Sequence, residues 1–406
     1  MSIEIRVTPP DRLRSAAEVV TTALMGPLPT DEVWEKRRAG WEAMGSVSAW
    51  DEGRCVGHAG VFDVDTAVPG GRRLPNGAVT RVAVLPTHRR RRVASGLVER
   101  LVADGVDRGL ALMSLWASET GIYRRFGFGH AGDNANLEIE VSGASPLRRA
   151  DLDGSFTLLS PEEALATIPA VYDAVALRRA GVITRPNETW WRRQFDALLE
   201  RTRAEFVVVH RDAAGTADGY VHYGTSWNDA SPDEAPTGAG TVHDLFGADE
   251  RVELALWQYL LDVDLVSTWR ANRRPVDDPV RRAARDSRAV RVRAVDDDQW
   301  VRLVDVDVAL AARVYRAVRG SVAVAVTDRL VERNNRTWRV SAEGAALTDD
   351  AADVSVDVSV LSALYLGGVT WRTLAATGDV DASDDVLHTA DALFGRDAAP
   401  WCGTFY

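Results

Sequence analysis

The stretch that decides the fold is Val79-Thr-Arg-Val-Ala-Val-Leu-Pro-Thr-His-Arg-Arg-Arg-Arg-Val-Ala-Ser-Gly-Leu97. It opens as an alternating strand that ends at Pro86, passes through four arginines, and continues with apolar residues at helical spacing. Because the first N–H groups of a helix lack partners and its dipole is positive there, an anion is favoured at this point. Arginines add charge and paired donors, so the stretch predicts a pyrophosphate site. The alternative is a solvated basic turn before an ordinary helix.

The residues around this stretch, about 1–142, predict a mixed α+β order with one helix crossing over between two strands that can pair in parallel. We expect strands at Ile3–Thr8, Val47–Trp50, Cys55–Val64, Ala78–Leu85, Leu110–Trp116 and Asn136–Val141. We expect helices at Asp11–Leu24, Asp31–Met44, Arg92–Arg108 and Gly121–Phe126.

Residues 143–285 repeat part of that order, which indicates an internal duplication. The expected strands are Phe206–His210, Gly219–Tyr223 and Thr241–Phe246, and the expected helices are Pro161–Ala180, one around Trp190 and Trp191, and Glu250–Val263. In place of the arginine turn, this copy has Phe246-Gly-Ala-Asp-Glu250, whose acids would repel a pyrophosphate. We therefore expect it to bind no coenzyme A.

Residues 286–406 form a third region with an expected α/β layer. Its expected strands are Leu303–Val308, Ser321–Val326, Thr337–Ser341 and Val354–Val360, and its expected helices are Ala309–Ala317, Ser359–Leu366 and Thr370–Thr377.

The composition limits the partners of the chain. The formal net charge of -11 over 406 residues argues against wholesale binding to nucleic acid and favours a cationic acceptor, although simple solubility also accounts for it. No apolar signal core or membrane-length run occurs, and the two cysteines, Cys55 and Cys402, fit a reducing cytoplasm. The seven histidines lack metal-ligand spacing, so we expect no metal site.

The segment Val79–Ala94 followed by Ser118-Glu-Thr-Gly-Ile-Tyr-Arg-Arg-Phe-Gly-Phe128 resembles the GNAT superfamily of acetyltransferases. More closely, it resembles the enhanced intracellular survival (Eis) family. The resemblance covers the whole chain. It implies an acetyltransferase domain at 1–142, a degenerate acetyltransferase domain at 143–285 and a sterol-carrier-protein-like domain at 286–406. Within the last of these, Leu364–Ala376 resembles the C-terminal domain of that family. It also implies a homohexamer.

The resemblance implies a set of acetyl-CoA contacts. The backbone of Val82, Ala83 and Val84 would pair with the pantetheine arm as an added strand, and Ser118 and Glu119 would line the arm. The pyrophosphate would lie on Arg89, Arg90, Arg91, Arg92, Val93, Ala94 and Ser95. Arg92 stands where the superfamily has glycine. If that position needs a positive φ, arginine costs roughly 1 kcal/mol or more.

The resemblance also implies the catalytic groups. Tyr123 stands at the position of the general acid that protonates the departing sulfur. The base would be the α-carboxylate of Tyr406, at the end of an unexpectedly apolar tail, Trp401–Tyr406. With a usual pKa of about 3.5, that carboxylate needs desolvation or a water relay. The alternatives are a packed tyrosine and a tail that only packs on its own domain.

The acceptor pocket would be lined by Trp34, Arg81, Trp116 and Phe405. Family members acetylate polycationic amines such as aminoglycosides in an acidic pocket, whereas Arg81 and Phe405 make this one less anionic and more crowded. The leading hypothesis is an acetyl-CoA-dependent N-acetyltransferase of such small amines. The alternatives are a carrier of lipid or hydrophobic ligands with an inactive acetyltransferase domain, and a protein lysine acetyltransferase.

Overall fold

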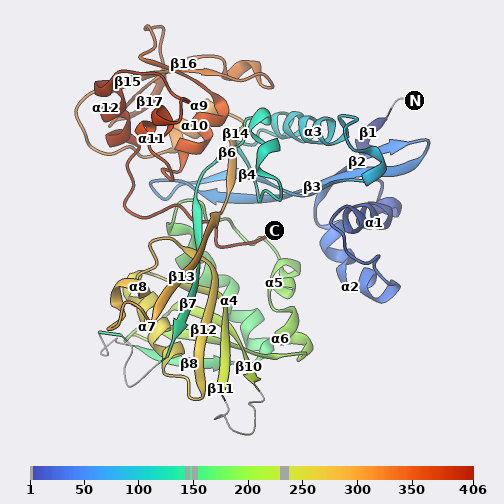
Figure 1. Ribbon diagram of the computed structural model, residues 1–406, viewed down its shortest axis with the longest axis vertical. Coiled ribbons are helices and arrows are strands. Elements are labelled where there is room, and N and C mark those ends of the chain that lie inside the picture. Colours follow the sequence, from blue (N-terminus) through green and yellow to red (C-terminus); the bar gives the residue numbers. More distant parts are fainter. Residues whose placement is uncertain (1–2, 142–146, 149–153, 229–236) are drawn as a thin grey trace. The chain divides into compact units, whose positions relative to one another are not determined.

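The computed structural model describes residues 3–141, 147–148, 154–228 and 237–406. They form three β-sheets of seven, seven and four strands, with helices packed on them (Figure 1). This mixed architecture confirms the α+β class that the sequence predicts.

The first sheet has the strand order β1-β2-β3-β4-β5-β14-β6. Strands β1 to β4 pair antiparallel, whereas β4 and β5 are parallel and therefore need a crossover, which is the helix α3. The strands are β1 (Glu4–Val7), β2 (Gly45–Asp51), β3 (Arg54–Ala67), β4 (Arg73–Val84), β5 (Leu112–Leu115), β14 (Trp300–Leu303) and β6 (Gly129–His130). The helices are α1 (Leu13–Ala23), α2 (Asp31–Glu42) and α3 (Val93–Asp107).

Helices cover both faces of this sheet at β3. Gly57 lies so close to α3 that an added Cβ would be 2.9 Å from Val93 Cγ1. The next residue, His58, contacts the Trp41 ring of α2, with 5.2 Å between ring centroids. Because successive strand residues point to opposite faces, α3 and α2 lie on opposite sides of the sheet (Figure 1).

The second sheet has the order β13-β7-β12-β11-β10-β9-β8. Its strands are β7 (Asp133–Glu140), β8 (Ser155–Leu159), β9 (Ala204–Arg211), β10 (Ala217–Asn228), β11 (Thr237–Gly247), β12 (Val266–Pro275) and β13 (Val290–Asp297). Its helices are α4 (Pro161–Val175), α5 (Glu188–Gln194), α6 (Asp196–Glu200), α7 (Glu250–Leu261) and α8 (Val280–Ala283). The parallel pair β11 and β12 corresponds to β4 and β5, and α7 corresponds to α3, as the duplication predicts.

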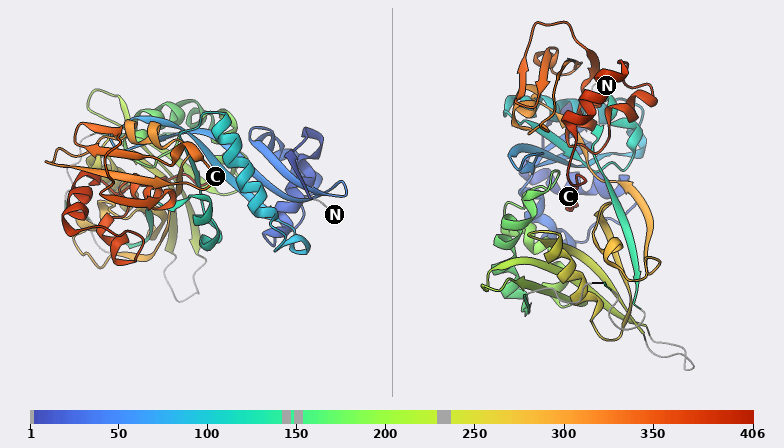
Figure 2. Two further views of the ribbon diagram at one scale, coloured as in Figure 1. Left: turned by 90° about the horizontal axis from the view of Figure 1, so that it is seen from above. Right: turned by 90° about the vertical axis from the view of Figure 1, so that its left-hand side faces the viewer.

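Strands β7 and β14 each pair in a different sheet from the strand that precedes them in the sequence. Strand β6 belongs to the first sheet, but β7, only a few residues later, pairs with β12 and β13 in the second (Figure 2). Conversely, β14 follows β13 of the second sheet in the sequence but pairs with β5 and β6 of the first. The predicted strand Asn136–Val141 exists as part of β7 and pairs in the second sheet, although the sequence placed it with the strands of residues 1–142. The boundary at 142–143 lies outside the described residues, and the division into 1–142, 143–285 and 286–406 stays a prediction.

The third sheet has the order β17-β16-β15-β18 and packs with four helices. Its strands are β15 (Ser321–Thr327), β16 (Thr337–Ser341), β17 (Gly344–Leu347) and β18 (Val354–Asp357). The helices are α9 (Val306–Ala312), α10 (Val358–Tyr365), α11 (Trp371–Ala376) and α12 (Asp384–Phe394). Every residue of α10 is buried.

Of two strands expected in the third region, one does not form and one is shorter than predicted, because an aspartate starts a helix in each. Asp305 accepts a hydrogen bond from the N–H of Val308 and begins α9, so the expected strand Leu303–Val308 does not form. Asp357 accepts one from the N–H of Ser359 and begins α10, so the strand ends there rather than at Val360. Aspartate is favoured at helix starts for this reason.

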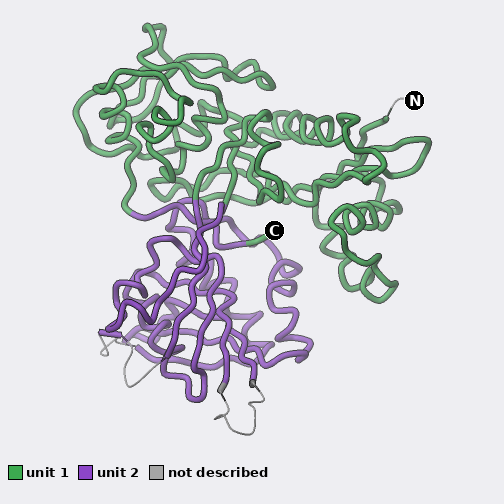
Figure 3. Tube along the Cα trace, in the orientation of Figure 1, with its two compact units in different colours: residues 1–132, 299–397, 405–406 green, residues 133–298, 398–404 purple. Residues whose placement is uncertain are grey.

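The described chain divides into two compact units (Figure 3). The first unit comprises residues 1–132, 299–397 and 405–406, and the second comprises residues 133–298 and 398–404. Among the described residues, no helix combines the length and apolar character needed to cross a membrane.

Within the second unit, the segment 398–404 is tied down by buried polar groups. Asp298 Oδ2 accepts a 2.6 Å hydrogen bond from the N–H of Cys402. Arg185 pairs with Asp244 at 2.5 Å and donates to Thr404 Oγ1 at 3.0 Å. The Asp298 side chain is buried, although it ends the acidic run Asp296–Asp298, which is typical of an exposed connection.

This burial predicts a pH-dependent stability. Burial outweighs the Cys402 hydrogen bond and raises the pKa of Asp298 to about 7. Between about pH 4 and pH 7 the folded state keeps a proton that the unfolded state releases, so raising the pH weakens folding until both states are ionised. Asp298→Asn removes this titration and keeps an oxygen acceptor. In urea unfolding, we expect its stability relative to wild type to be unchanged at pH 4 and about 2–4 kcal/mol higher at pH 8. A difference that does not vary with pH would contradict this.

Candidate active site

A gap opens beside β4 where β5 stops. The parallel pairing runs from Asn76 with Leu112 to Val79 with Leu115, whereas β4 continues to Val84. Over that last part, β4 pairs with β3, and within the described chain no strand pairs with its other edge. The backbone groups of Val82–Val84 are therefore placed where an extended ligand can hydrogen-bond like an added strand.

A β-bulge turns β4 at the start of this gap. The register of β3 against β4 shifts between His58, opposite Ala83, and Gly60, opposite Thr80. The bulge contains Arg81, whose φ of +56° is rare for a residue with a side chain. Bulges bend a strand and redirect its side chains, and they recur next to active sites.

The arginine turn leads from β4 into α3, as predicted. Arg90 and Arg92 both have left-handed backbones, with φ of +61° and +60°. Arg92 is the residue before the helix, and no side chain caps the first turn, because arginine has no acceptor. The amides at Val93, Ala94 and Ser95 are therefore not satisfied by a capping side chain and, with the helix dipole, favour an anion.

Asp51, at the end of β2, holds the arginine turn in place. Asp51 Oδ2 lies 3.1 Å from an Arg91 guanidinium nitrogen and 3.2 Å from His88 Nε2. Burial acts in the opposite direction, but these bonds hold the pKa of Asp51 below its ordinary value. Arg91 thus fixes the turn, although it is exposed, as are Arg89, Arg90 and Arg92.

The left-handed backbone at Arg92 predicts that glycine would relieve strain there. Arginine at positive φ costs roughly 1–2 kcal/mol, and the extra freedom of unfolded glycine offsets part of the gain. In urea unfolding, we expect Arg92→Gly to be more stable than the matched control Arg89→Gly by about 1 kcal/mol. Arg89 is the control because its φ is -63°, where arginine is unstrained. Equal stability of the two variants would contradict the strain.

Tyr123 follows β5 between the turns η3 (Thr120–Ile122) and η4 (Arg124–Phe126). Its side chain is buried and packs edge-on against Phe128, with ring centroids 6.1 Å apart. Burial, and secondarily the negative charge of Glu119, raise the pKa of the Tyr123 phenol to about 12. The phenol therefore carries its proton at neutral pH. Ser118 and Glu119, also predicted to line the cofactor, are exposed just beyond β5.

A buried arginine that sequence reasoning missed supports the turn after Tyr123. A guanidinium nitrogen of Arg302, on β14, donates to the carbonyl oxygen of Phe126 at 2.5 Å, and another pairs with Asp328 at 2.7 Å. Gly127 makes space for the guanidinium, because a Cβ added at this residue would be 1.6 Å from Arg302. No local pattern distinguishes Arg302 from the many exposed arginines.

The last two residues lie in the first unit with Tyr123. The buried Tyr406 phenol lies 2.7 Å from Ser114 Oγ on β5, and Asn76 Nδ2 donates to the same oxygen at 2.8 Å. Phe405 contacts the edge of Trp116, with ring centroids 5.5 Å apart. The tail therefore meets β5 where that strand ends beside the gap.

The four predicted acceptor residues form two groups of contacting side chains. The Arg81 guanidinium lies 4.3 Å from the Trp41 ring centroid, and Trp34 packs on the same Trp41. Trp116 and Phe405 form the other group. Arg81 also influences His58, because burial and then the charge of Arg81 lower the His58 pKa to about 3.

The corresponding helix of the second sheet begins differently. The Asp249 carboxylate accepts hydrogen bonds from the N–H groups of Arg251 and Val252 at the start of α7. Because these amides already have a partner and the first turn carries acids, the arrangement favours our expectation that this copy binds no coenzyme A, which stays a prediction.

Comparison with known proteins places this geometry in a family. An acetyltransferase (GNAT) domain family matches residues 4–131, a second GNAT domain family matches 181–304, and a sterol carrier protein domain family matches 306–403. The N-acetyltransferase Eis of Mycobacterium bovis is 30% identical over 84% of this chain and 83% of its own length. The chain belongs to the Eis family.

Other relatives agree with this Eis-family assignment. The crystal structure of Eis1 from Mycobacterium abscessus superposes with a TM-score of 0.87 at 34% identity, covering 99% of this chain and 100% of that one. An uncharacterized N-acetyltransferase of Streptomyces griseus is 33% identical over 99% of both chains. The protein is thus an N-acetyltransferase with two GNAT domains followed by a sterol-carrier-like domain, as the sequence predicts.

Proposed function

We propose that this Eis-family protein transfers the acetyl group of acetyl-CoA to amines of polycationic, aminoglycoside-like small molecules. One observation carries the proposal. The open edge at Val82–Val84 leads to a helix start with no capping side chain, and the buried, protonated Tyr123 follows the neighbouring strand.

Each part of acetyl-CoA has a matching group in the proposal. The backbone of Val82–Val84 pairs with the amides of the pantetheine arm, as in strand addition. The amides at Val93–Ser95, with the exposed Arg89, Arg90 and Arg92, bind the pyrophosphate. Ser118 and Glu119 line the arm near the thioester. Acetyl-CoA supplies the activated acetyl group, and no metal is needed for this transfer.

In the proposed reaction, the neutral amine attacks the thioester carbonyl. A C–N bond forms, the C–S bond breaks, and Tyr123 gives its proton to the departing sulfur. The α-carboxylate of Tyr406 takes the proton of the attacking amine. Because its usual pKa is about 3.5, the transfer passes through water or uses a desolvated carboxylate. The burial of Tyr406 supports this role.

The acceptor is proposed to be a compact polyamine. The net charge of -11 favours a cation at long range, whereas Arg81 and Phe405 reduce the negative charge and the space near the site. By the same family resemblance we propose a hexamer, which light scattering would measure. We also propose a cytoplasmic location, which the unpaired, buried Cys55 and Cys402 fit.

The test is acetyl-CoA turnover over a panel of amines, with a thiol reagent to detect the released coenzyme A. Kanamycin, spermidine and a lysine peptide are the acceptors. We expect turnover well above the blank with kanamycin or spermidine and little with the peptide. A preference for the peptide indicates a protein acetyltransferase instead. If calorimetry detects no binding of acetyl-CoA, the proposal fails in favour of a ligand carrier.

A further inference from the structure

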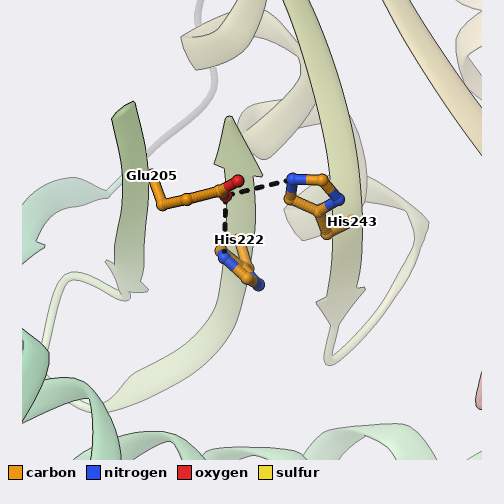
Figure 4. A group of neighbouring side chains, drawn as sticks. All are labelled: Glu205, His222 and His243. Carbon is orange, nitrogen blue, oxygen red and sulfur yellow. Dashed lines mark ion pairs between the residues drawn. The ribbon is translucent and has the colours of Figure 1, made fainter. Parts of the chain in front are cut away.

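Three side chains that the acetyltransferase site does not use meet on the second sheet. They are Glu205 of β9, His222 of β10 and His243 of β11, which point toward one another from neighbouring strands (Figure 4). Glu205 Oε2 lies 3.1 Å from His222 Nε2 and 3.0 Å from His243 Nε2. One ligand atom from each residue lies within 4.8 Å of the other two.

Strand pairing explains why these residues meet. Glu205 pairs with Gly224, where an added Cβ would be 2.9 Å from Glu205 Oε1, so the glycine leaves room for the carboxylate. His222 precedes Gly224 by two residues and therefore shares its face of the sheet. In β11, the register passes from Asp244 to Val242, so His243 is the extra residue of a β-bulge. A bulge redirects the side chain of its extra residue.

The cluster is buried and its polar atoms are incompletely satisfied. The side chains of Glu205 and His222 are each 4% exposed, whereas that of His243 is 31% exposed. Within the described residues, Glu205 Oε2 and both ring nitrogens of His222 have no hydrogen bond of good geometry, although the two histidines lie within ion-pair distance of the carboxylate. Buried polar atoms without a well-formed hydrogen bond are costly, and a bound cation would satisfy them.

The chemistry of the three groups selects a class of ligand. Two imidazole nitrogens and one carboxylate oxygen suit Zn²⁺ and similar divalent transition metals. Bonds of about 2.1 Å in a tetrahedral arrangement separate ligand atoms by about 3.4 Å. The two observed separations are slightly shorter, so a small outward movement of the side chains would admit the ion. Three protein ligands leave a fourth position for water or a small ligand.

We propose that Glu205, His222 and His243 form a binding site for a divalent transition-metal ion of the zinc class, with its fourth position on the more exposed side of His243. The ion joins three adjacent strands of the second sheet. Because the site exists only in the folded sheet, binding raises the stability of the second unit. This proposal goes beyond the acetyl-transfer proposal and does not depend on it, because all three ligands lie in the second unit and Tyr123 lies in the first.

The test measures metal binding rather than activity. Full-length protein without a histidine tag is stripped with a chelator and titrated with ZnCl₂ by calorimetry. Cobalt is then added to separate stripped protein to record its visible spectrum. We expect one equivalent of tightly bound zinc per chain, cobalt bands typical of four-coordinate N/O ligation, and a higher melting temperature with zinc. Uptake of less than one equivalent by the wild type overturns the site and leaves a histidine–carboxylate cluster.

The variants identify the ligands. His243→Gln, at the most exposed position, is expected to weaken zinc binding about 100-fold or more. Glu205→Gln is a second variant in case one of them fails to fold. His210→Gln is the matched control. His210 lies on the same sheet, but it contacts the carboxylate of Asp218, 2.6 Å away, and is not one of the three proposed ligands. We expect it to bind zinc as the wild type does. Unchanged binding in folded His243→Gln, or an equal loss in His210→Gln, overturns the proposal.

Discussion

Tyr123→Phe is expected to lower kcat by about 100-fold or more, with the KM for acetyl-CoA nearly unchanged. The loss follows from removing the group proposed to protonate the leaving sulfur, because a general acid contributes roughly 10²–10⁴-fold. The side chain is buried and phenylalanine keeps its packing on Phe128, so binding of the cofactor is retained. Steady-state kinetics with the best amine of the panel measures the effect.

The pH profile of the wild type provides a second readout. The pKa of Tyr123 is raised to about 12, so the phenol keeps its proton throughout the range in which the amine becomes neutral. We expect kcat not to fall from loss of this proton below about pH 10.

Tyr315→Phe is the matched control for Tyr123→Phe, because this buried tyrosine donates to the Leu310 carbonyl, away from the proposed chemistry. It should lose stability but keep kcat; wild-type turnover by Tyr123→Phe would contradict the general-acid role.

A glycine added after Tyr406 is expected to lower kcat by about 100-fold or more. The extra residue displaces the terminal carboxylate by about 3.5 Å, beyond the reach of a hydrogen bond to the reacting amine. Intact mass spectrometry first establishes that the unmodified chain ends at Tyr406. A semisynthetic protein with a terminal amide keeps the length, removes the charge, and should show the same loss.

Tyr406→Phe is the control for this experiment. It keeps the carboxylate and the ring but loses the contact with Ser114 Oγ, so a reduction of less than about 10-fold is expected. Thermal melting shows whether each variant remains folded. If the glycine-extended and amidated proteins are folded and turn over at the wild-type rate, the terminal carboxylate is not the base.

The parts of the fold that depend on local sequence were predictable. The strand–turn–helix at Val79–Leu97 forms as expected, because alternation, proline and helical spacing act within a few residues. Thr30 likewise caps α2 by accepting from the N–H of Val33, a role for which threonine before a helix is favoured. The superfamily has glycine at the position of Arg92, so a positive φ could be foreseen there, and the structure has it.

The features that depend on distant partners were not predictable. Strands β7 and β14 have ordinary patterns, and nothing in them indicates which sheet they join. The metal site proposed at Glu205 depends on the β-bulge at His243, and the spacing of histidines along the sequence does not reveal this bulge. The sequence therefore predicted no metal site. Asp298 lies in an acidic run typical of exposed loops, whereas its side chain is buried and accepts a hydrogen bond from the backbone of the distant Cys402.

The pairing of β14 with β5 and β6 has a consequence during synthesis of the chain on the ribosome. The first sheet lacks the strand between β5 and β6 until Leu303 has left the exit tunnel. At about 5–20 residues per second, the growing chain waits roughly 10–40 s after Leu115 with β5 as an open edge. An unpaired edge can recruit strands of other chains, so nascent chains released before Leu303 should be prone to aggregation and depend on chaperones.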